Sequence, residues 1–239
     1  MVFNTQFFFD TMILCAKAIP TTLRIFLISY LLSLIFGFIL GVLKLHGPGW
    51  AKRVIGIYLS VVRGIPLVVQ ILLLYSIFPS VFQSILDSMG SSYRIYDLKP
   101  EVYAYIIFVL NTSAGLTEIF RSGLETVGSA QLEAAYTSGM STFSAYTRII
   151  IPQALARVLP NLCTTATGVL KQTSLVFLMT IKDITGVAKI AAGYGYDYIE
   201  AYSDIWVIYI VLCLIIETIF KLLEKNMTVY QTGRSTARC

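Results

Sequence analysis

The sequence predicts an all-α integral membrane protein, a single domain over 1–239 with five transmembrane helices. Charged residues make up only 13% of the chain and apolar residues 56%, with a mean hydropathy of +0.76. An ordinary soluble domain has about a quarter of its residues charged. The charges here separate uncharged runs close to the length of about 20 residues that a membrane-spanning helix needs. Nucleic-acid binding is not expected, because the Lys and Arg residues flank these runs and do not cluster on one face.

The five expected spans cover about 20–44, 54–80, 101–122, 158–181 and 203–223. The first contains 19 uncharged residues between Arg24 and Lys44, and we expect Pro20 with the two threonines after it to begin the helix. Gly37 and Gly41 form a G-x-x-x-G pattern in this span, which is a weak indication of a helix-packing face.

The remaining spans are recognised in the same way. The second contains 23 uncharged residues, and Pro66 near its start suits a first helical turn. The third contains 16 uncharged residues. The apolar runs of the fourth and fifth each carry one charge, Lys171 and Glu217.

The basic residues predict the orientation. Five spans place the two termini on opposite sides, and cytoplasmic segments are richer in Lys and Arg. With the N-terminus outside, the inner segments carry eleven basic residues and the outer segments six. The sequence therefore predicts an N-out/C-in topology.

One inner segment, about 123–152, is neither apolar enough to span nor composed like a slack linker. Its Ala, Leu, Gln and Glu residues at 130–135 favour a short helix. Gly139 is suited to end this helix and Ser141 to cap a second one, and Pro152 and Pro160 break or kink the chain beyond it. We expect a rigid helix–turn–helix on the inner surface, of the kind that docks a soluble partner.

The same segment carries a recognisable motif. Glu133-Ala134-Ala135 is followed after three residues by Gly139, and after nine more by Ile149-Ile150-Ile151-Pro152. This spacing resembles the cytoplasmic signature of the permease subunits of ABC importers, with Ile151 in place of the usual Leu. Further stretches resemble the polar amino-acid branch of that family, the histidine, glutamine, arginine and cystine type: 20–23, 63–70, 118–125, 152–155 and 170–175. A departure occurs at 128–130, where Gly-Ser-Ala stands in place of the usual Pro and Gly before the Gln.

The resemblance implies a type I ABC importer permease fold in a bacterial cytoplasmic membrane. It implies a second permease, identical or related, an ABC ATPase dimer docked on a coupling helix formed by Glu133, Ala134, Ala135 and Gly139, and an extracytoplasmic solute-binding protein that delivers an amino acid. The chain has no G-x-x-x-x-G-K-[ST] phosphate loop. We therefore expect no cofactor and no enzymatic activity here, with ATP and magnesium bound by the partner ATPase.

Polar residues inside the spans are candidates to line the path. A charge inside a span costs about 2.5–3.5 kcal/mol on insertion scales and usually faces a path or a partner, so Lys171 either contacts the substrate carboxylate or pairs with a group such as Glu118. The other candidates carry amides or hydroxyls, which either line the path or only join helices: Gln70, Asn111, Thr112, Ser113, Thr164, Thr167, Gln172 and Thr173.

Two other functions remain open from the residues alone. An intramembrane enzyme would need a catalytic pair, but the one histidine, His46, lies in an inner loop and the spans hold no pair of aspartates. A channel or membrane scaffold would not need the inner motif. The tyrosine-rich outer segment 194–202 is typical of an interfacial aromatic belt or of a docking surface for the binding protein. The substrate is not fixed, although 190–223 resembles cystine-type permeases.

Overall fold

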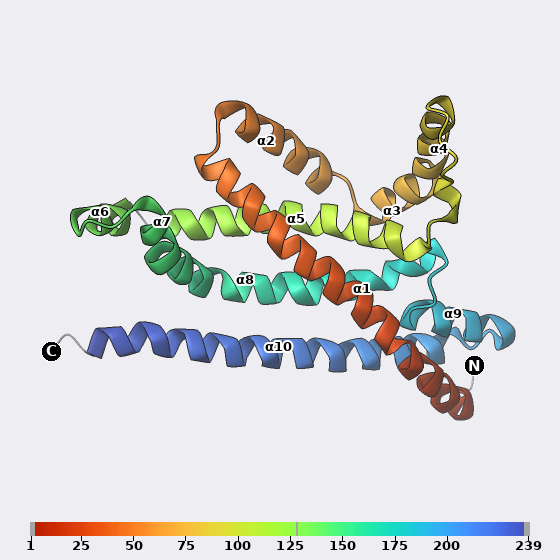
Figure 1. Cartoon of the computed structure of the whole chain (residues 1–239). Coiled ribbons are helices and arrows are strands. Elements are labelled where there is room, and N and C mark those ends of the chain that lie inside the picture. The colour runs from red at the N-terminus through yellow and green to blue at the C-terminus, as the bar shows by residue number, and fades with distance from the viewer. Residues whose placement is uncertain (1–2, 128, 237–239) are drawn as a thin grey trace.

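The computed structural model describes residues 3–127 and 129–236, without the side chains of residue 129 and of 228–236. All regular elements in this part of the chain are helices, which confirms the all-α prediction (Figure 1). The α-helices are α1 (Thr5–His46), α2 (Gly49–Gly64), α3 (Leu67–Ser76), α4 (Phe78–Ser88), α5 (Pro100–Thr126), α6 (Ser129–Thr137), α7 (Thr142–Ala145), α8 (Ile151–Gln172), α9 (Ile184–Gly195) and α10 (Tyr198–Thr236). A 3-10 turn, η1 (Ile95–Asp97), precedes α5, a π-helical turn, η2 (Tyr146–Ile150), joins α7 to α8, and a 3-10 helix, η3 (Thr173–Met179), follows α8.

Four segments of the described chain are long and apolar enough to cross a membrane: Thr5–His46, Leu67–Ser88, Pro100–Thr126 and Tyr198–Met227. The fourth predicted span, 158–181, corresponds to α8 and η3. With 22 residues α8 is about 33 Å long, enough to cross the hydrocarbon core, but it is more polar than the other four.

The first helix begins well before the predicted start. Pro20 does not open it but lies inside α1, so that expectation was wrong. The helix is instead capped by Asn4, whose side chain accepts a hydrogen bond from the backbone N–H of Phe7 at 3.1 Å. At 42 residues α1 is about 63 Å long, twice the thickness of the hydrocarbon core. Its first turns therefore extend the helix beyond the span that hydropathy indicated.

The second predicted span, 54–80, is not one helix. It includes most of α2, all of α3 and the start of α4, and Ile65 and Pro66 adopt extended backbone between α2 and α3. Pro66 precedes the first turn of α3 instead of occupying it. The break has a local cause, because proline restricts the residue before it to extended conformations and cannot donate a backbone hydrogen bond.

The centre of the fold is the packing of α1 against α5. A Cβ added at Gly37 would lie 2.6 Å from the Cβ of Leu116, and one at Gly41 would lie 3.0 Å from the carbonyl oxygen of Thr117. The G-x-x-x-G pattern is thus a packing face for α5. Near the C-terminal end of α1, Lys44 pairs with Glu118 of α5, which also pairs with Arg121 at 3.0 Å.

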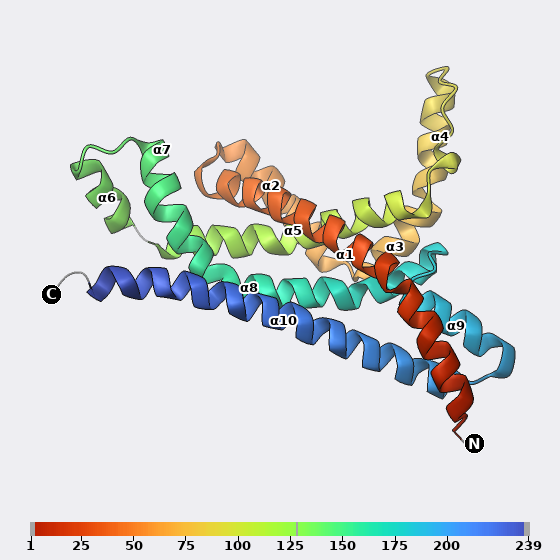
Figure 2. The ribbon, with the colours of Figure 1, turned by 60° about the horizontal axis from the view of Figure 1, so that its bottom comes forward.

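The two ends of the bundle differ in the elements they carry. The C-terminal end of α10 lies at the same end as α6 and α7, whereas the N-terminus lies beside α9 at the opposite end (Figure 2). The short helices α6 and α7 extend from one end of the bundle.

Candidate functional site

The helix–turn–helix predicted for the inner segment is present as α6 and α7. The chain leaves α6 through Gly139 with φ of +76°, a left-handed conformation that favours glycine. The N–H of Met140 donates to the carbonyl of Ala135 at 3.1 Å and the N–H of Gly139 to that of Tyr136 at 2.9 Å, the two bonds of a Schellman motif. Ser141 then caps α7 by accepting from the N–H of Ser144 at 3.3 Å. The roles expected of Gly139 and Ser141 in ending and starting helices are confirmed.

The surface of α6 is divided between packing and exposure. Ala135 is buried, and Leu132 packs against a small apolar cluster formed by Leu124, Val127, Ile150 and Ala154. Glu133 and Ala134 are exposed on the other side. The exposed face therefore combines one carboxylate with a small side chain that permits close approach.

Two exposed aromatic side chains extend this face and were missed from the sequence. Tyr136 is 44% exposed and Phe143, on α7, is 78% exposed. Large exposed aromatics at the tip of a protruding element are typical of a surface that is buried by a partner. The sequence does not reveal that these aromatic side chains are exposed. Only the fold shows that Phe143 lies outside the small apolar cluster below α6.

Leu132 packs α6 against residues of α5, η2 and α8, and two side-chain contacts join the elements on either side of the helix–turn–helix. Arg157 of α8 donates to the carbonyl oxygen of Thr126 at the end of α5. The hydroxyl of Tyr146 and the Nε2 atom of His46 lie 2.8 Å apart, joining η2 to the end of α1. Displacement of α6 and α7 is therefore coupled to α1, α5 and α8.

Beyond its first turn, α8 carries its exposed residues on one stripe. Arg157, Pro160, Asn161, Thr164 and Lys171 are exposed, and their spacing of three, four and seven residues places them on a single face of the helix. None of them is a large aliphatic residue. The exposed face of α1, in contrast, carries large aliphatic residues such as Leu31, Ile35 and Ile39. We call these five residues of α8 the polar stripe.

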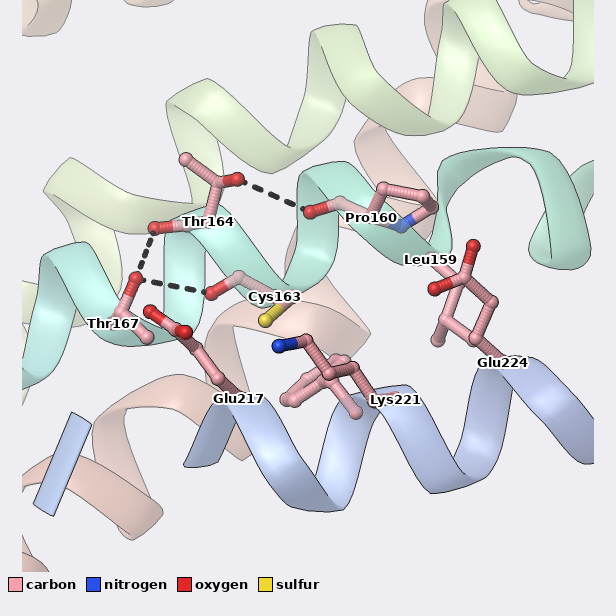
Figure 3. A pocket seen from close by; sticks show the side chains of 9 residues that line it. Leu159, Pro160, Cys163, Thr164, Thr167, Glu217, Lys221 and Glu224 are labelled. Carbon is pink, nitrogen blue, oxygen red and sulfur yellow. Dashed lines mark hydrogen bonds between the residues drawn. The ribbon is translucent and has the colours of Figure 1, made fainter. Parts of the chain in front are cut away.

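A cavity of about 230 Å³ adjoins the polar stripe between α8 and the C-terminal half of α10 (Figure 3). Its α8 wall is formed by Leu159, Pro160, Cys163, Thr164 and Thr167, and its α10 wall by Glu217, Phe220, Lys221 and Glu224. The hydroxyl of Thr164 donates to the carbonyl of Pro160 at 3.1 Å, and that of Thr167 to the carbonyl of Thr164 at 3.1 Å. The hydroxyl hydrogens are used within the helix, so both threonines offer acceptor lone pairs to the cavity.

The amide candidates Gln70 and Asn111 lie away from the polar stripe, at the break between α2 and α3. Gln70 is buried, and its Nε2 donates to the carbonyls of Val62 and Ile65, both at 2.8 Å, at the break between α2 and α3. Asn111 of α5 donates to its Oε1 at 3.3 Å. These bonds fasten the broken helix to α5, which is a joining role.

The hydroxyl candidates of α5, Thr112 and Ser113, are buried, as Gln70 is. Ser113 lies 2.8 Å from the hydroxyl of Tyr58, and the hydroxyl of Thr112 has no hydrogen-bond partner in the described part of the chain.

The last three candidates lie at the end of α8 and the start of η3. Lys171 is exposed, Gln172 is half-buried, and Thr173 is buried with its hydroxyl 3.3 Å from that of Tyr209. Glu118 does not pair with Lys171, because Lys44 and Arg121 occupy it. Of the whole candidate set, Thr164 and Lys171 therefore belong to the polar stripe, and Thr167 lines the cavity beside it.

Comparison with known proteins gives the family. The model of the family "Binding-protein-dependent transport system inner membrane component" matches residues 33–229. The chain belongs to this family. It is an inner-membrane permease of the amino-acid ABC transporters.

Individual relatives agree with this assignment. The permease is 32% identical over 229 residues to the octopine transport system permease protein of Rhizobium radiobacter, covering 94% of this chain and 90% of that protein. It is 30% identical to the arginine ABC transporter permease protein of Haemophilus influenzae, covering 90% and 92%. A crystal structure of an amino acid ABC transporter with histidines contains a chain with a TM-score of 0.78 and 27% identity, covering 95% of this permease and 100% of that chain.

Proposed function

We propose that this permease is one of two subunits, identical or related, that enclose an alternating-access path for a polar amino acid. In this arrangement the topology is N-out/C-in with five spans, α8 being the fourth. An ABC ATPase dimer docks at the inner end and hydrolyses ATP, and an extracytoplasmic solute-binding protein delivers the amino acid at the outer end.

The polar stripe of α8 is the observation that carries this proposal. A lipid-facing stripe would place Arg157, Asn161 and Lys171 in or beside hydrocarbon, where a charge costs about 2.5–3.5 kcal/mol even on insertion scales. Polar faces of membrane helices instead line aqueous cavities or meet other protein chains. A second permease facing this stripe removes it from lipid and encloses a polar passage.

The groups on this face suit an amino acid. A zwitterion needs donors for its carboxylate and acceptors for its ammonium group. Lys171 and Asn161 supply donors on the stripe, and Thr164, Thr167 and Glu217 supply acceptors at the cavity. The relatives are described as carriers of octopine and arginine, and cystine remains the guess from the sequence of 190–223. Uptake competition with arginine, histidine, glutamine and cystine would identify the substrate.

Coupling runs through the exposed face of α6. Glu133 offers a charge to a basic group of the ATPase, and Ala134 permits close backbone approach. Because Leu132 packs α6 on residues of α5 and α8, and the Tyr146–His46 contact joins η2 to α1, closure of the ATPase dimer tilts α8 with its polar stripe. Such rigid-body rocking is the usual form of alternating access.

The test uses the assembled importer in proteoliposomes. Glu133→Ala removes a charge-assisted contact worth about 1.5–3 kcal/mol, so we expect ATP-dependent uptake to fall on the order of tenfold while membrane insertion persists. Gln131→Ala, an exposed change on the same helix, is the control and should leave uptake intact. Full uptake by Glu133→Ala, or a permease that brings down no ATPase after mild extraction, would contradict the proposal.

A further inference from the structure

A buried carboxyl group lies in the outer part of the bundle, away from the polar stripe. Asp204 of α10 is 0% exposed, and neither of its carboxylate oxygens has a hydrogen-bond or ion-pair partner in the part of the chain that the structure describes. The hydroxyl of Thr185, on α9, is likewise buried and without a partner there. Transport through the polar stripe uses neither group.

The helix α10 sets the position of Asp204. Glu200 lies four residues earlier on the same face of α10 and accepts a hydrogen bond from the backbone N–H of Asn4 at 2.7 Å. Asp204 therefore faces α1 one turn further along, where the thiol of Cys15 lies within electrostatic range of both Asp204 and Asp183. The thiol of Cys15 donates to the carbonyl of Ile184 at 3.7 Å, so α1, α9 and α10 meet at this point.

No described cation balances this carboxyl group. The titratable groups around it are acids or weak acids: Cys15 of α1, which interacts with Asp204 and with Asp183 at the start of α9, and Glu200 one turn earlier on α10. Of the basic groups on these elements, Lys189 of α9 lies over the ring of Phe177 at 4.0 Å and Arg24 of α1 pairs with Glu101 at 3.7 Å. Lys17 of α1 and Lys182, just before α9, are exposed.

A second acid at the junction shows how a carboxylate is stabilised there. Asp183 is also buried, but it accepts from the N–H groups of Thr185 at 3.1 Å and Gly186 at 2.8 Å. Burial raises its pKa to about 6 even so. Asp204 has the burial without these donors, and an isolated carboxylate in such surroundings takes up a proton instead of remaining charged.

We propose that Asp204 is a proton-binding site that, when occupied, holds α1 against α9 and α10. The protonated carboxyl group is neutral and can donate to a backbone carbonyl of the preceding turn, as Ser203 does to Ile199 at 2.8 Å. Loss of the proton leaves a buried charge that is relieved only if water or a cation enters, which separates α1 from α10. The folded state then binds a proton that the unfolded state releases, so stability falls as the pH rises.

The test uses the full-length permease in lipid nanodiscs, by infrared spectroscopy. We expect the wild type at pH 6 to show a protonated-carboxyl C=O component that is absent from Asp204→Asn and persists in Asp183→Asn. The component should disappear at high pH in the wild type itself, a result that depends on no variant. Absence of this component at pH 6, or its loss only in Asp183→Asn, would overturn the proposal.

A thermal measurement gives a second readout. Asn is nearly isosteric with the neutral acid, so Asp204→Asn should fold and should lose less unfolding temperature than the wild type between pH 4 and 7. Asp204→Glu should retain a pH-dependent unfolding temperature. An Asp204→Asn variant with the same pH dependence as the wild type would contradict the proton site, whether or not the importer transports amino acids.

Discussion

The contact between α1 and α5 predicts that Gly37→Ala destabilises the permease. The added Cβ would lie 2.6 Å from the Cβ of Leu116, whereas ordinary contact begins at about 3.4 Å. The Cβ of Leu116 is fixed to its backbone, so no rotamer change relieves the overlap and the two helices must separate. Overpacking of this kind costs about 1–3 kcal/mol.

A matched control separates this overlap from helix propensity. Replacing glycine by alanine inside a helix gains about 0.5–1 kcal/mol. Gly115, on α5, has nothing within 4 Å of an added Cβ, so Gly115→Ala should gain this amount without a clash. The two variants should therefore differ by about 1–3 kcal/mol in free energy of unfolding.

The assay is reversible unfolding of the full-length permease in mixed micelles or lipid, with stability measured for the wild type and both variants. Gly37→Ala should be the less stable variant. Equal stability of Gly37→Ala and Gly115→Ala would refute the view that the G-x-x-x-G face sets the distance between α1 and α5.

Three further predictions concern the turn, the helix break and the buried acid of α9. Gly139→Ala forces a side chain into a left-handed conformation at a cost of about 1–2 kcal/mol, so ATP-dependent uptake should fall. The control Gly90→Ala, at φ of +69° and remote from α6, should carry a similar strain and leave uptake unchanged. Equal uptake by the two variants would contradict the role of the turn. Gln70→Leu leaves the carbonyls of Val62 and Ile65 without their donor and should lower the free energy of unfolding by about 1–3 kcal/mol. Gln131→Leu, at an exposed position, should lower it little. If Gln70→Leu leaves the stability unchanged, Gln70 does not fasten the helix break to α5. Burial raises the pKa of Asp183 to about 6, so the folded state binds the proton more tightly than the unfolded state. The free energy of unfolding should therefore fall as the pH rises from about 4 to about 6. Asp183→Asn should abolish that part of the pH dependence, and an unchanged pH profile would contradict the prediction.

The helix–turn–helix of α6 and α7 could be predicted from the sequence because its determinants are local. Gly139 and Ser141 each act on the backbone within a few residues, so their spacing fixes a helix end and a helix start wherever the segment lies. The expectation that an ATPase docks there comes from the resemblance of the motif alone, because local chemistry does not name a partner.

The start of α1 and the break after α2 were missed because they depend on neighbours. Hydropathy marks the segment of a helix that suits lipid, not where the helix begins, and Asn4 with the contacts of Glu200 extends α1 to residues that hydropathy passes over. At Pro66 the proline was visible, but whether it starts a helix or breaks one depends on the carbonyls that Gln70 satisfies.

The candidate path illustrates a further limit. A polar residue inside a span is recognisable from sequence, but the direction of its side chain is not. Exposure separates Thr164 and Lys171, on the polar stripe, from Ser113 and Thr173, which are buried in contacts between helices. Glu217 was visible as a charge in an apolar run, yet only the packing of α10 on α8 brings it to the cavity of Thr167.

Accessibility of Cys163 tests the central claim most directly. Its thiol lines the cavity beside the polar stripe, so it can be labelled in the assembled importer after the other cysteines are replaced. Ile215→Cys in the same background, an exposed position on α10, is the control for a lipid-facing site. We predict that a water-soluble thiol reagent modifies Cys163 but not residue 215, and that the rate at Cys163 changes between nucleotide-free and ATP-bound states. Equal labelling at both positions, or a rate at Cys163 that is indifferent to nucleotide, would contradict a path along α8 that is driven from the cytoplasm.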